Sequence, residues 1–278
     1  MPPKNKILYY YTYYIYIHLC KCGFIDKMKG VVAFLLGIGY LAITDAPRLN
    51  NVLQVDAGLG KVVVRDAHSN AYFLTGLNWN RLSTIRLKHV TVGPAGLWGV
   101  GINNKVHKYV AGTFKPSTGL SMLQVDAGHD QVVGVSPSSI AYCLNSRITL
   151  SYRGVGSLSW RSLSRRLKYS SCGPLGCWGV DTNDRVLFTQ NVKPSTCSPS
   201  GWRMLPGSLT MIEVGTDGRV FGVNKQGNVY ERTGISTARP FGLNWVHIPM
   251  CMAMRHVSYD LGKPWVVSKS GLIMHCSS

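Results

Sequence analysis

The chain has 278 residues, and 30 lysines and arginines against 12 aspartates and glutamates give it a formal net charge of +18. Few carboxyl groups are therefore present for chemistry that needs paired carboxylates, and the positive charge favours anionic partners. No Gly-x-Ser-x-Gly, His-Glu-x-x-His or P-loop motif occurs, and Asn104 stands where a dinucleotide fingerprint beginning at Gly99 needs its third glycine. We expect no enzyme, no cofactor and no metal.

The N-terminal segment divides at Met28. Lys29 is followed by an apolar run and then by small residues, a pattern typical of a secretory signal peptide over residues 28–46. Residues 1–27 precede it and are rich in tyrosine. We interpret 1–27 as a doubtful leader from a mis-assigned start, with a genuine apolar anchor as the alternative. The prediction is a secreted protein without a stable membrane span in its mature chain.

Residues 49–278 repeat one unit. Gly-Pro-x-Gly-x-Trp-Gly-Val occurs at residues 93–100 and again at 173–180, and weaker copies follow the same frame. The copies are anchored, 35 to 45 residues apart, at Val63, Trp98, Val133, Trp178, Phe221 and Trp265. The corresponding units lie near residues 49–83, 84–121, 122–166, 167–208, 209–253 and 254–278.

Each unit contains short runs of β-forming residues separated by turn residues, without extended helical periodicity. Four short antiparallel strands per unit of roughly 40 residues are typical of a propeller blade, so we predict an all-β, six-bladed β-propeller that leaves no second domain. The last unit has only three strands. Because a propeller closes its ring, the missing strand should come from the N-terminus, just before Leu53.

A tryptophan closes four of the units. Two interpretations stay open for this set, packing between blades, which we favour, or stacking against a bound sugar. The tryptophans are Trp79, Trp160, Trp202 and Trp245.

Six cysteines follow the leader, and six allow fifteen pairings. Cys172 and Cys177 flank a Gly-Pro-Leu-Gly turn, so a hairpin would place them within disulfide range. A second expected bridge joins Cys143 and Cys197 in neighbouring blades. Without a Cys-x-x-Cys pair after the leader, a zinc site is disfavoured.

Several long segments carry a family likeness. "LKHVTVGPAGLWGV", "LQVDAG", "YSSCGPLGCWGV", "MIEVGTDGRVFGVN" and "HVSYDLGKPWVVS" resemble the tectonin-repeat lectins, especially the fish-egg lectins and more distantly the tachylectin-1 type. The resemblance implies a secreted six-bladed tectonin propeller that binds N-acetylglucosamine-type sugars and bacterial surface glycans in eggs or innate immunity.

The sequence departs from this family in three places. Relatives carry an N-terminal cysteine that we would expect to pair at the position of Cys276, but none lies between Lys29 and Tyr142 here. Cys251 is additional, so Cys276 either pairs with it or is free. The first unit also lacks the aromatic-glycine pair at Val63-Val64.

Sugar-binding proteins use planar polar side chains and an aromatic face, and repeated weak sites gain avidity. The candidates are polar inter-strand turns, although ordinary turn chemistry explains the same residue types. They are Asn103, Asn104, Asn183, Asp184, Asn224 and Asn228, with the four closing tryptophans as stacking surfaces.

The expected partners are N-acetylglucosamine-containing glycans, bacterial lipopolysaccharide or cell-wall surfaces, and an egg glycoprotein, but not nucleic acid. An alternative function is an extracellular interaction propeller that binds an acidic glycoprotein through its basic surface.

Overall fold

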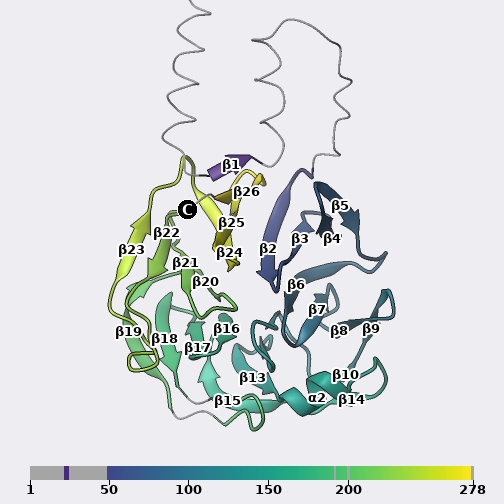
Figure 1. The fold of residues 1–278 in the computed structure, drawn as a ribbon. Helices are drawn as coiled ribbons and strands as arrows, with labels where there is room; N and C mark the ends of the chain where they lie inside the picture. Colours follow the sequence, from purple (N-terminus) through teal and green to yellow (C-terminus); the bar gives the residue numbers. More distant parts are fainter. Residues whose placement is uncertain (1–21, 25–48, 191, 199–200, 277–278) are drawn as a thin grey trace, which may run out of the picture.

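The computed structural model describes residues 22–24, 49–190, 192–198 and 201–276. Six four-stranded antiparallel sheets surround a central axis, so the predicted six-bladed β-propeller is confirmed (Figure 1). The expected leader and signal peptide lie outside the described residues, apart from residues 22–24.

The first three blades follow one another in chain order. Blade 1 contains β2 (Val52–Gly58), β3 (Lys61–Asp66), β4 (Ala71–Thr75) and β5 (Asn78–Arg81). Blade 2 contains β6 (Leu87–Gly93), β7 (Gly96–Gly101), β8 (Val106–Val110) and β9 (Thr113–Pro116). Blade 3 contains β11 (Gln124–Asp126), β12 (Val132–Val135), β13 (Ile140–Leu144) and β15 (Arg161–Arg166).

The other blades complete the wheel. Blade 4 contains β16 (Tyr169–Gly173), β17 (Gly176–Val180), β18 (Arg185–Thr189) and β19 (Arg203–Ser208). Blade 5 contains β20 (Met211–Val214), β21 (Val220–Val223), β22 (Val229–Arg232) and β23 (Trp245–Ile248). Blade 6 contains β24 (Met254–Asp260), β25 (Lys263–Ser268), β26 (Ile273–Cys276) and β1 (Cys22–Phe24).

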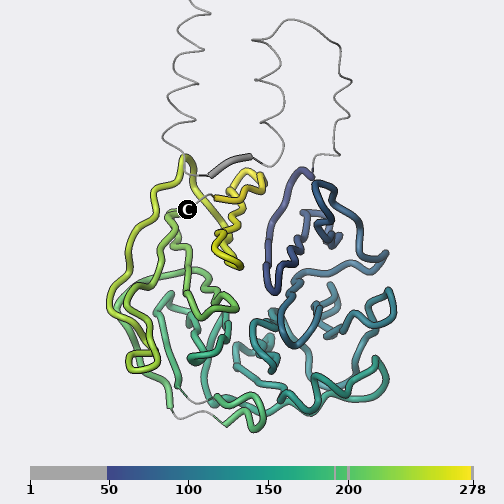
Figure 2. The backbone as a smooth tube through the Cα atoms, viewed as in Figure 1, coloured from purple at the N-terminus to yellow at the C-terminus, as the bar shows by residue number. Residues whose placement is uncertain are grey.

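Ring closure differs in one detail from the expectation. The N-terminus does supply the fourth strand of blade 6, but β1 pairs with β26 and places Cys22 opposite Cys276, so the strand does not come from the residues just before Leu53. Those residues instead start β2, where the Val52 amide donates to the Gly271 carbonyl of blade 6 at 3.0 Å. The C-terminal strands therefore lie beside the start of blade 1 (Figure 2).

A short helix interrupts blade 3. The α2 helix (Ser146–Ser151) begins where the Asn145 side chain accepts a hydrogen bond from the Ile148 amide, a local cap that the periodicity of so short a segment does not reveal. A small parallel pair, β10 (Thr118–Gly119) with β14 (Ser157–Leu158), lies outside the six sheets.

The repeated aromatic-glycine pair has a packing cause. A Cβ on Gly99 would approach a Leu87 methyl at 2.7 Å, and one on Gly179 would approach Leu167 at 2.6 Å. In blades 2, 4 and 5 the leucine at the start of the unit (Leu87, Leu167 or Leu209) therefore requires glycine in the second strand. Blade 1 has Val64 in place of the glycine and the smaller Val52 at its start, both buried, which is a compensating change of volume.

Both expected disulfides are formed. Cys172–Cys177 spans the β16–β17 hairpin, and Cys143–Cys197 joins β13 of blade 3 to the outer loop of blade 4. Cys251 and Cys276 are also disulfide-bonded, which excludes the free Cys276 left open by the sequence.

Because consecutive strands in each blade are antiparallel, the loops of the propeller lie on two distinct faces. We call the upper face the one formed by the loops between first and second strands and between third and fourth strands of each blade. The lower face carries the loops between second and third strands and the links between blades. A site built from one kind of loop therefore lies on one face only.

Candidate functional site

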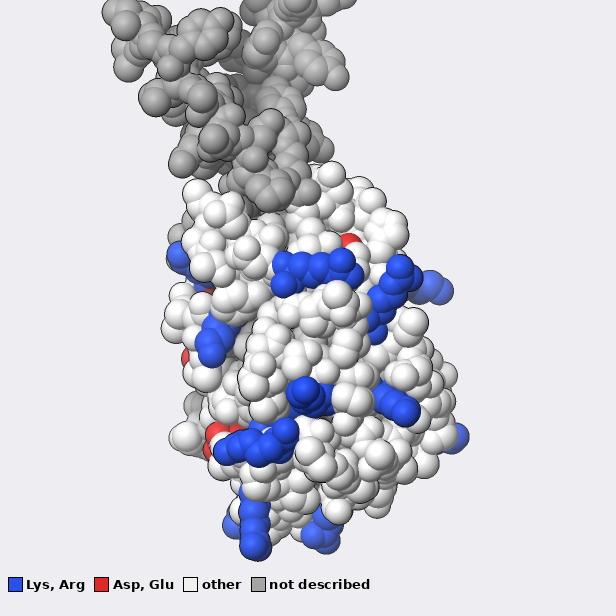
Figure 3. Space-filling view, turned by 90° about the vertical axis from the view of Figure 1, so that its right-hand side faces the viewer, with Lys and Arg blue, Asp and Glu red and all other residues white. Residues whose placement is uncertain are grey.

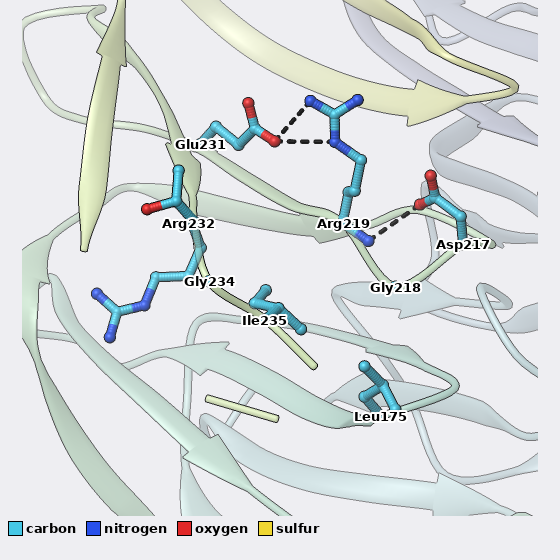
Figure 4. Close-up of a pocket in the computed structure, with 9 residues that line it drawn as sticks. Leu175, Asp217, Gly218, Arg219, Glu231, Arg232, Gly234 and Ile235 are labelled. Atoms are coloured by element: carbon cyan, nitrogen blue, oxygen red, sulfur yellow. Dashed lines mark hydrogen bonds and ion pairs between the residues drawn. The ribbon is translucent and has the colours of Figure 1, made fainter. Parts of the chain in front are cut away.

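The candidate site is a groove on the upper face between blades 4 and 5. It has a volume of about 310 Å³ and contains part of the β16–β17 turn, the β20–β21 turn and the loop that follows β22 (Figure 4). We call it the Arg219 groove. Its lining residues are Leu175, Asp217, Gly218, Arg219, Glu231, Arg232, Thr233, Gly234 and Ile235.

Arg219 is held rigidly at this groove. Its Nε and one terminal nitrogen donate to Glu231 Oε1 at 2.8 and 2.6 Å, and the other terminal nitrogen donates to the Tyr259 hydroxyl at 2.5 Å. The guanidinium also lies 4.5 Å from the centre of the Tyr259 ring. Burial alone would lower the pKa of Arg219, but the bonds to Glu231 and Tyr259 outweigh it and raise the pKa, so the guanidinium stays charged.

The groove offers unused acceptors beside this cation. Asp217 Oδ1 accepts the Arg219 backbone amide at 3.0 Å. Among the described residues, Asp217 Oδ2 and Glu231 Oε2 accept no hydrogen bond. Leu175 and Ile235 supply an apolar wall on the other side of the groove in Figure 4. Fixed planar polar groups facing an apolar wall match a sugar ring, which has hydroxyls at its edge and C–H groups on its faces.

A second groove lies one blade earlier, and its lining contains no arginine and no carboxylate. It has a volume of about 320 Å³ and involves His129 from the blade 3 turn, residues 173–176 from the blade 4 turn, and residues 192–194 from the outer loop of blade 4. The turn of one blade thus meets the turn and outer loop of the next in both grooves. The position of the groove therefore repeats, whereas the Asp217, Arg219 and Glu231 side chains occur in the first groove alone.

The polar turns expected from the sequence lie on the lower face, away from both grooves. Lys88 donates to Asn104 within blade 2, and Lys168 forms an ion pair with Asp184 within blade 4. Asn224 accepts the amides of Gly227 and Asn228 at 3.0 and 2.9 Å.

The remaining asparagines differ in whether their side chains form hydrogen bonds. Asn103 accepts the Lys105 amide at 3.2 Å, whereas Asn183 and Asn228 expose side chains for which the described residues show no hydrogen bond. Sugar binding by these turns stays a prediction.

The four closing tryptophans sit between blades at the rim. Trp202 donates to the Leu163 carbonyl of blade 3 at 3.1 Å, and Trp245 donates to the Pro206 carbonyl of blade 4 at 3.0 Å. Trp79 is only 9% exposed, and Trp160 is half-buried against the blade 2–3 core. These contacts favour the packing interpretation.

Sequence reasoning missed Asp217, Arg219 and Glu231. The signal available was the strand register: Glu231 pairs with Phe221 in the β21–β22 hairpin, and Arg219 lies two residues before Phe221, on the same side of the strand. To predict that Arg219 and Glu231 meet, the boundaries of both strands would have to be known within one residue.

Comparisons with known proteins agree with this architecture. A family model for the Tectonin domain matches residues 51–269. The chain belongs to the tectonin family. A fish-egg lectin from Cyprinus carpio is 44% identical over 156 residues, which cover 55% of this chain and 65% of that relative. The chain thus matches just under two thirds of the relative's length.

Solved structures share the propeller fold with this tectonin chain at low identity. Virginiamycin B lyase from Staphylococcus aureus gives a TM-score of 0.55 at 11% identity, covering 83% of this chain and 98% of that one. Prp20p from Saccharomyces cerevisiae gives 0.53 at 11% identity, covering 91% and 79%. These two likenesses concern the fold alone.

Two further observations concern the described part of the chain. No three side chains of histidine, cysteine, aspartate or glutamate within it are grouped to hold a metal ion. None of its helices has the length and apolar character needed to span a bilayer.

Proposed function

We propose that this tectonin propeller is a secreted, non-enzymatic lectin that binds N-acetylglucosamine-type sugars, including those on bacterial surface glycans and lipopolysaccharide, in egg or innate-immune defence. The observation that carries the proposal is the Arg219 groove, in which a fixed guanidinium and two open carboxylate oxygens face an apolar wall. The identity to a carp fish-egg lectin supports it.

The groove predicts how the sugar is held. Glu231 Oε2 and Asp217 Oδ2 accept hydroxyl protons, while Leu175 and Ile235 contact a face of the ring. One such site is weak alone, and contacts of a multivalent surface with the second groove one blade earlier would raise the retention, although that groove has a different lining.

Retention on chitin or N-acetylglucosamine resin tests the function. We expect elution by free N-acetylglucosamine and little elution by 0.5 M salt, roughly the range where charge contacts are strongly screened. Glu231→Gln with Asp217→Asn should reduce retention, whereas Asn183→Ala with Asn228→Ala on the lower face should not. The reverse result would place the sugar at the polar turns.

The charge distribution favours one alternative, an interaction propeller that binds an acidic glycoprotein. Lysines and arginines are scattered over the side shown in Figure 3, where few carboxylates are visible, and the net charge is +18. Elution from the resin by salt alone, with no effect of free sugar, would support this alternative and contradict the lectin proposal.

A further inference from the structure

Two neighbouring hairpin turns of the upper face contain the same triplet, leucine-glycine-lysine. It occurs at residues 59–61, in the β2–β3 turn of blade 1, and at residues 261–263, in the β24–β25 turn of blade 6. None of the other four turns between first and second strands has this triplet. Because blade 6 lies beside blade 1 in the ring, β24 packs next to β2 (Figure 1). We call residues 59–61 and 261–263 the leucine tips.

The leucines of both tips are exposed and have an unfavourable backbone conformation. Leu59 is 56% exposed and Leu261 is 73% exposed. Their φ angles of 54° and 48° lie in the left-handed region, where a side chain crowds the backbone and where asparagine or glycine fits better. An apolar side chain at a position that is unfavourable for both backbone and hydration indicates a role in contacts with another body.

Polar contacts hold the two tips together. Asp260 Oδ2 accepts the Gly60 amide at 2.6 Å, which joins the blade 1 tip to blade 6. Asp260 Oδ1 accepts the Thr216 hydroxyl of blade 5 at 2.5 Å. A Cβ on Gly60 would lie 3.5 Å from a Leu261 methyl group, so this leucine lies against the other tip. The two tips therefore form one patch whose parts are fixed relative to each other.

The exposed charge of this patch is positive. Lys61 lies opposite Gly58 in its hairpin, Lys263 lies opposite Asp260, and both lysine side chains are exposed. Neither lysine forms an ion pair or a hydrogen bond within the described part of the chain. The Asp260 carboxylate is buried and accepts the two hydrogen bonds given above. The surface thus presents two apolar side chains flanked by two ammonium groups.

We propose that the leucine tips dock the propeller on an anionic phospholipid bilayer. Leu59 and Leu261 enter the boundary between headgroups and acyl chains, and Lys61 and Lys263 contact the anionic headgroups. The leucines stand on hairpin turns and line neither of the two grooves. A fluid interface adapts to such turns, whereas a protein partner would need a matching pocket. A second copy of this chain is disfavoured, because a symmetric contact would bring the lysines of both copies together.

The docking patch borders the Arg219 groove but uses different residues. Thr216, which donates to Asp260, directly precedes Asp217 of that groove. Vesicles without sugar headgroups separate lipid docking from the proposed lectin function. Free N-acetylglucosamine in excess should leave vesicle binding unchanged, so failure of either proposal can be recognised without the other.

Cosedimentation with vesicles tests the contribution of charge. Vesicles of phosphatidylcholine and phosphatidylglycerol in equal parts should bind the unmodified protein about 30-fold or more tightly than vesicles of phosphatidylcholine alone, the effect of two lysines at an anionic surface. Lys61→Gln with Lys263→Gln should remove about 30-fold of this binding. The matched control is Lys105→Gln with Lys225→Gln, which removes two exposed positive charges from the lower face and should leave binding nearly unchanged.

The same assay tests the leucines. Leu59→Asn with Leu261→Asn should weaken binding to the anionic vesicles by roughly tenfold or more, because two apolar contacts are lost. This variant should keep its fold, since asparagine suits both turns, and an unchanged or higher Tm checks this. Ile102→Asn is the control, because it replaces a 61% exposed apolar side chain on the lower face. It should bind like the unmodified protein.

The proposal is overturned if both kinds of vesicle bind equally, if the leucine variant binds like the unmodified protein, or if a control loses as much binding as its matched variant. Light scattering distinguishes the remaining occupant of the patch. A concentration-dependent dimer that the leucine variant abolishes, together with no vesicle binding, would assign the tips to a second copy of the chain and contradict lipid docking.

Discussion

The carboxyl groups of Asp56 and Asp126 are unusual because both are buried at the propeller axis. Burial raises the pKa of Asp56 from 3.8 to about 6, against the opposing effect of its hydrogen bonds. Burial and the neighbouring Asp56 charge raise the pKa of Asp126 to about 8. The folded protein therefore keeps both carboxyl groups protonated up to a higher pH than the unfolded chain does.

The sign of the resulting pH dependence follows directly. Stability from these two groups is complete below pH 3.8 and declines as the pH rises, up to about 6 for Asp56 and about 8 for Asp126. We expect Asp126→Asn to flatten this decline, because asparagine keeps an acceptor for the Cys172 amide without ionising. Urea unfolding between pH 4 and pH 8 measures it.

Asp181 provides a control of opposite sign. Burial opposes its ionisation, but hydrogen bonds from Arg185 and Asn183 outweigh burial and lower its pKa. Asp181→Asn should therefore remove stability that the parent protein keeps above pH 3.8 and loses in acid. If Asp126→Asn and Asp181→Asn gave the same slope, the buried carboxyl at the axis would not be protonated as described.

Individual site residues were less predictable than the fold. The sequence showed the polar turns because they are local patterns, and asparagine in a turn looks the same whether or not it binds a ligand. Arg219 and Glu231 meet through strand register, and His89 and His256 both reach Tyr169 only through ring closure. Contacts made by tertiary geometry leave no local signal.

At the scale of single elements, two turns contain strained leucines. Leu59 and Leu261 have φ angles of 54° and 48°, and each precedes a glycine that also has positive φ. Two-residue hairpins of this kind favour asparagine at the first position, and a left-handed conformation costs a leucine about 1–2 kcal/mol.

Leu59→Asn should therefore stabilise the protein by roughly 0.5–1 kcal/mol. Leu77 is a matched control, because both leucines are 56% exposed and Leu77 is not among the residues with positive φ. Leu77→Asn should leave the free energy of unfolding nearly unchanged. Equal effects of the two substitutions in urea titrations would show that exposure, and not backbone strain, decides the outcome.

The two described disulfides differ in the length of chain that they close. Cys143–Cys197 spans 54 residues and Cys172–Cys177 spans 5. Loop entropy predicts a loss of about 4 kcal/mol for the first bridge and about 2 kcal/mol for the second. We expect the double Cys143→Ala, Cys197→Ala variant to unfold at lower urea concentration than the double Cys172→Ala, Cys177→Ala variant. The opposite order would point to packing lost in the β16–β17 hairpin.

The strands themselves were readily predicted, because each unit alternates β-forming runs with turn residues. The α2 helix was not, since six residues held by one cap give no helical periodicity. The source of the fourth strand in blade 6 was also misplaced. Any short extended segment can pair with the open edge strand of blade 6. The sequence therefore indicated that a fourth strand was needed but did not identify Cys22–Phe24 as that strand.

For the whole molecule, Tyr169 joins blades that are distant around the ring. Its hydroxyl contacts Glu213 of blade 5, His256 of blade 6 and His89 of blade 2. Tyr169→Phe leaves these buried groups unsatisfied, so we expect a loss of about 2–3 kcal/mol. Tyr109→Phe is the control, since Tyr109 packs against apolar residues that include Phe114, and its hydroxyl has no hydrogen bond within the described residues. A similar small loss for both would mean that the axis does not couple the blades.

The two faces of the wheel differ in what they are made of: the turns between first and second strands border the open grooves, whereas the links between blades lie on the opposite face. Groove residues can therefore be substituted without altering the peptide segments that connect one blade to the next, so the two faces can be engineered separately.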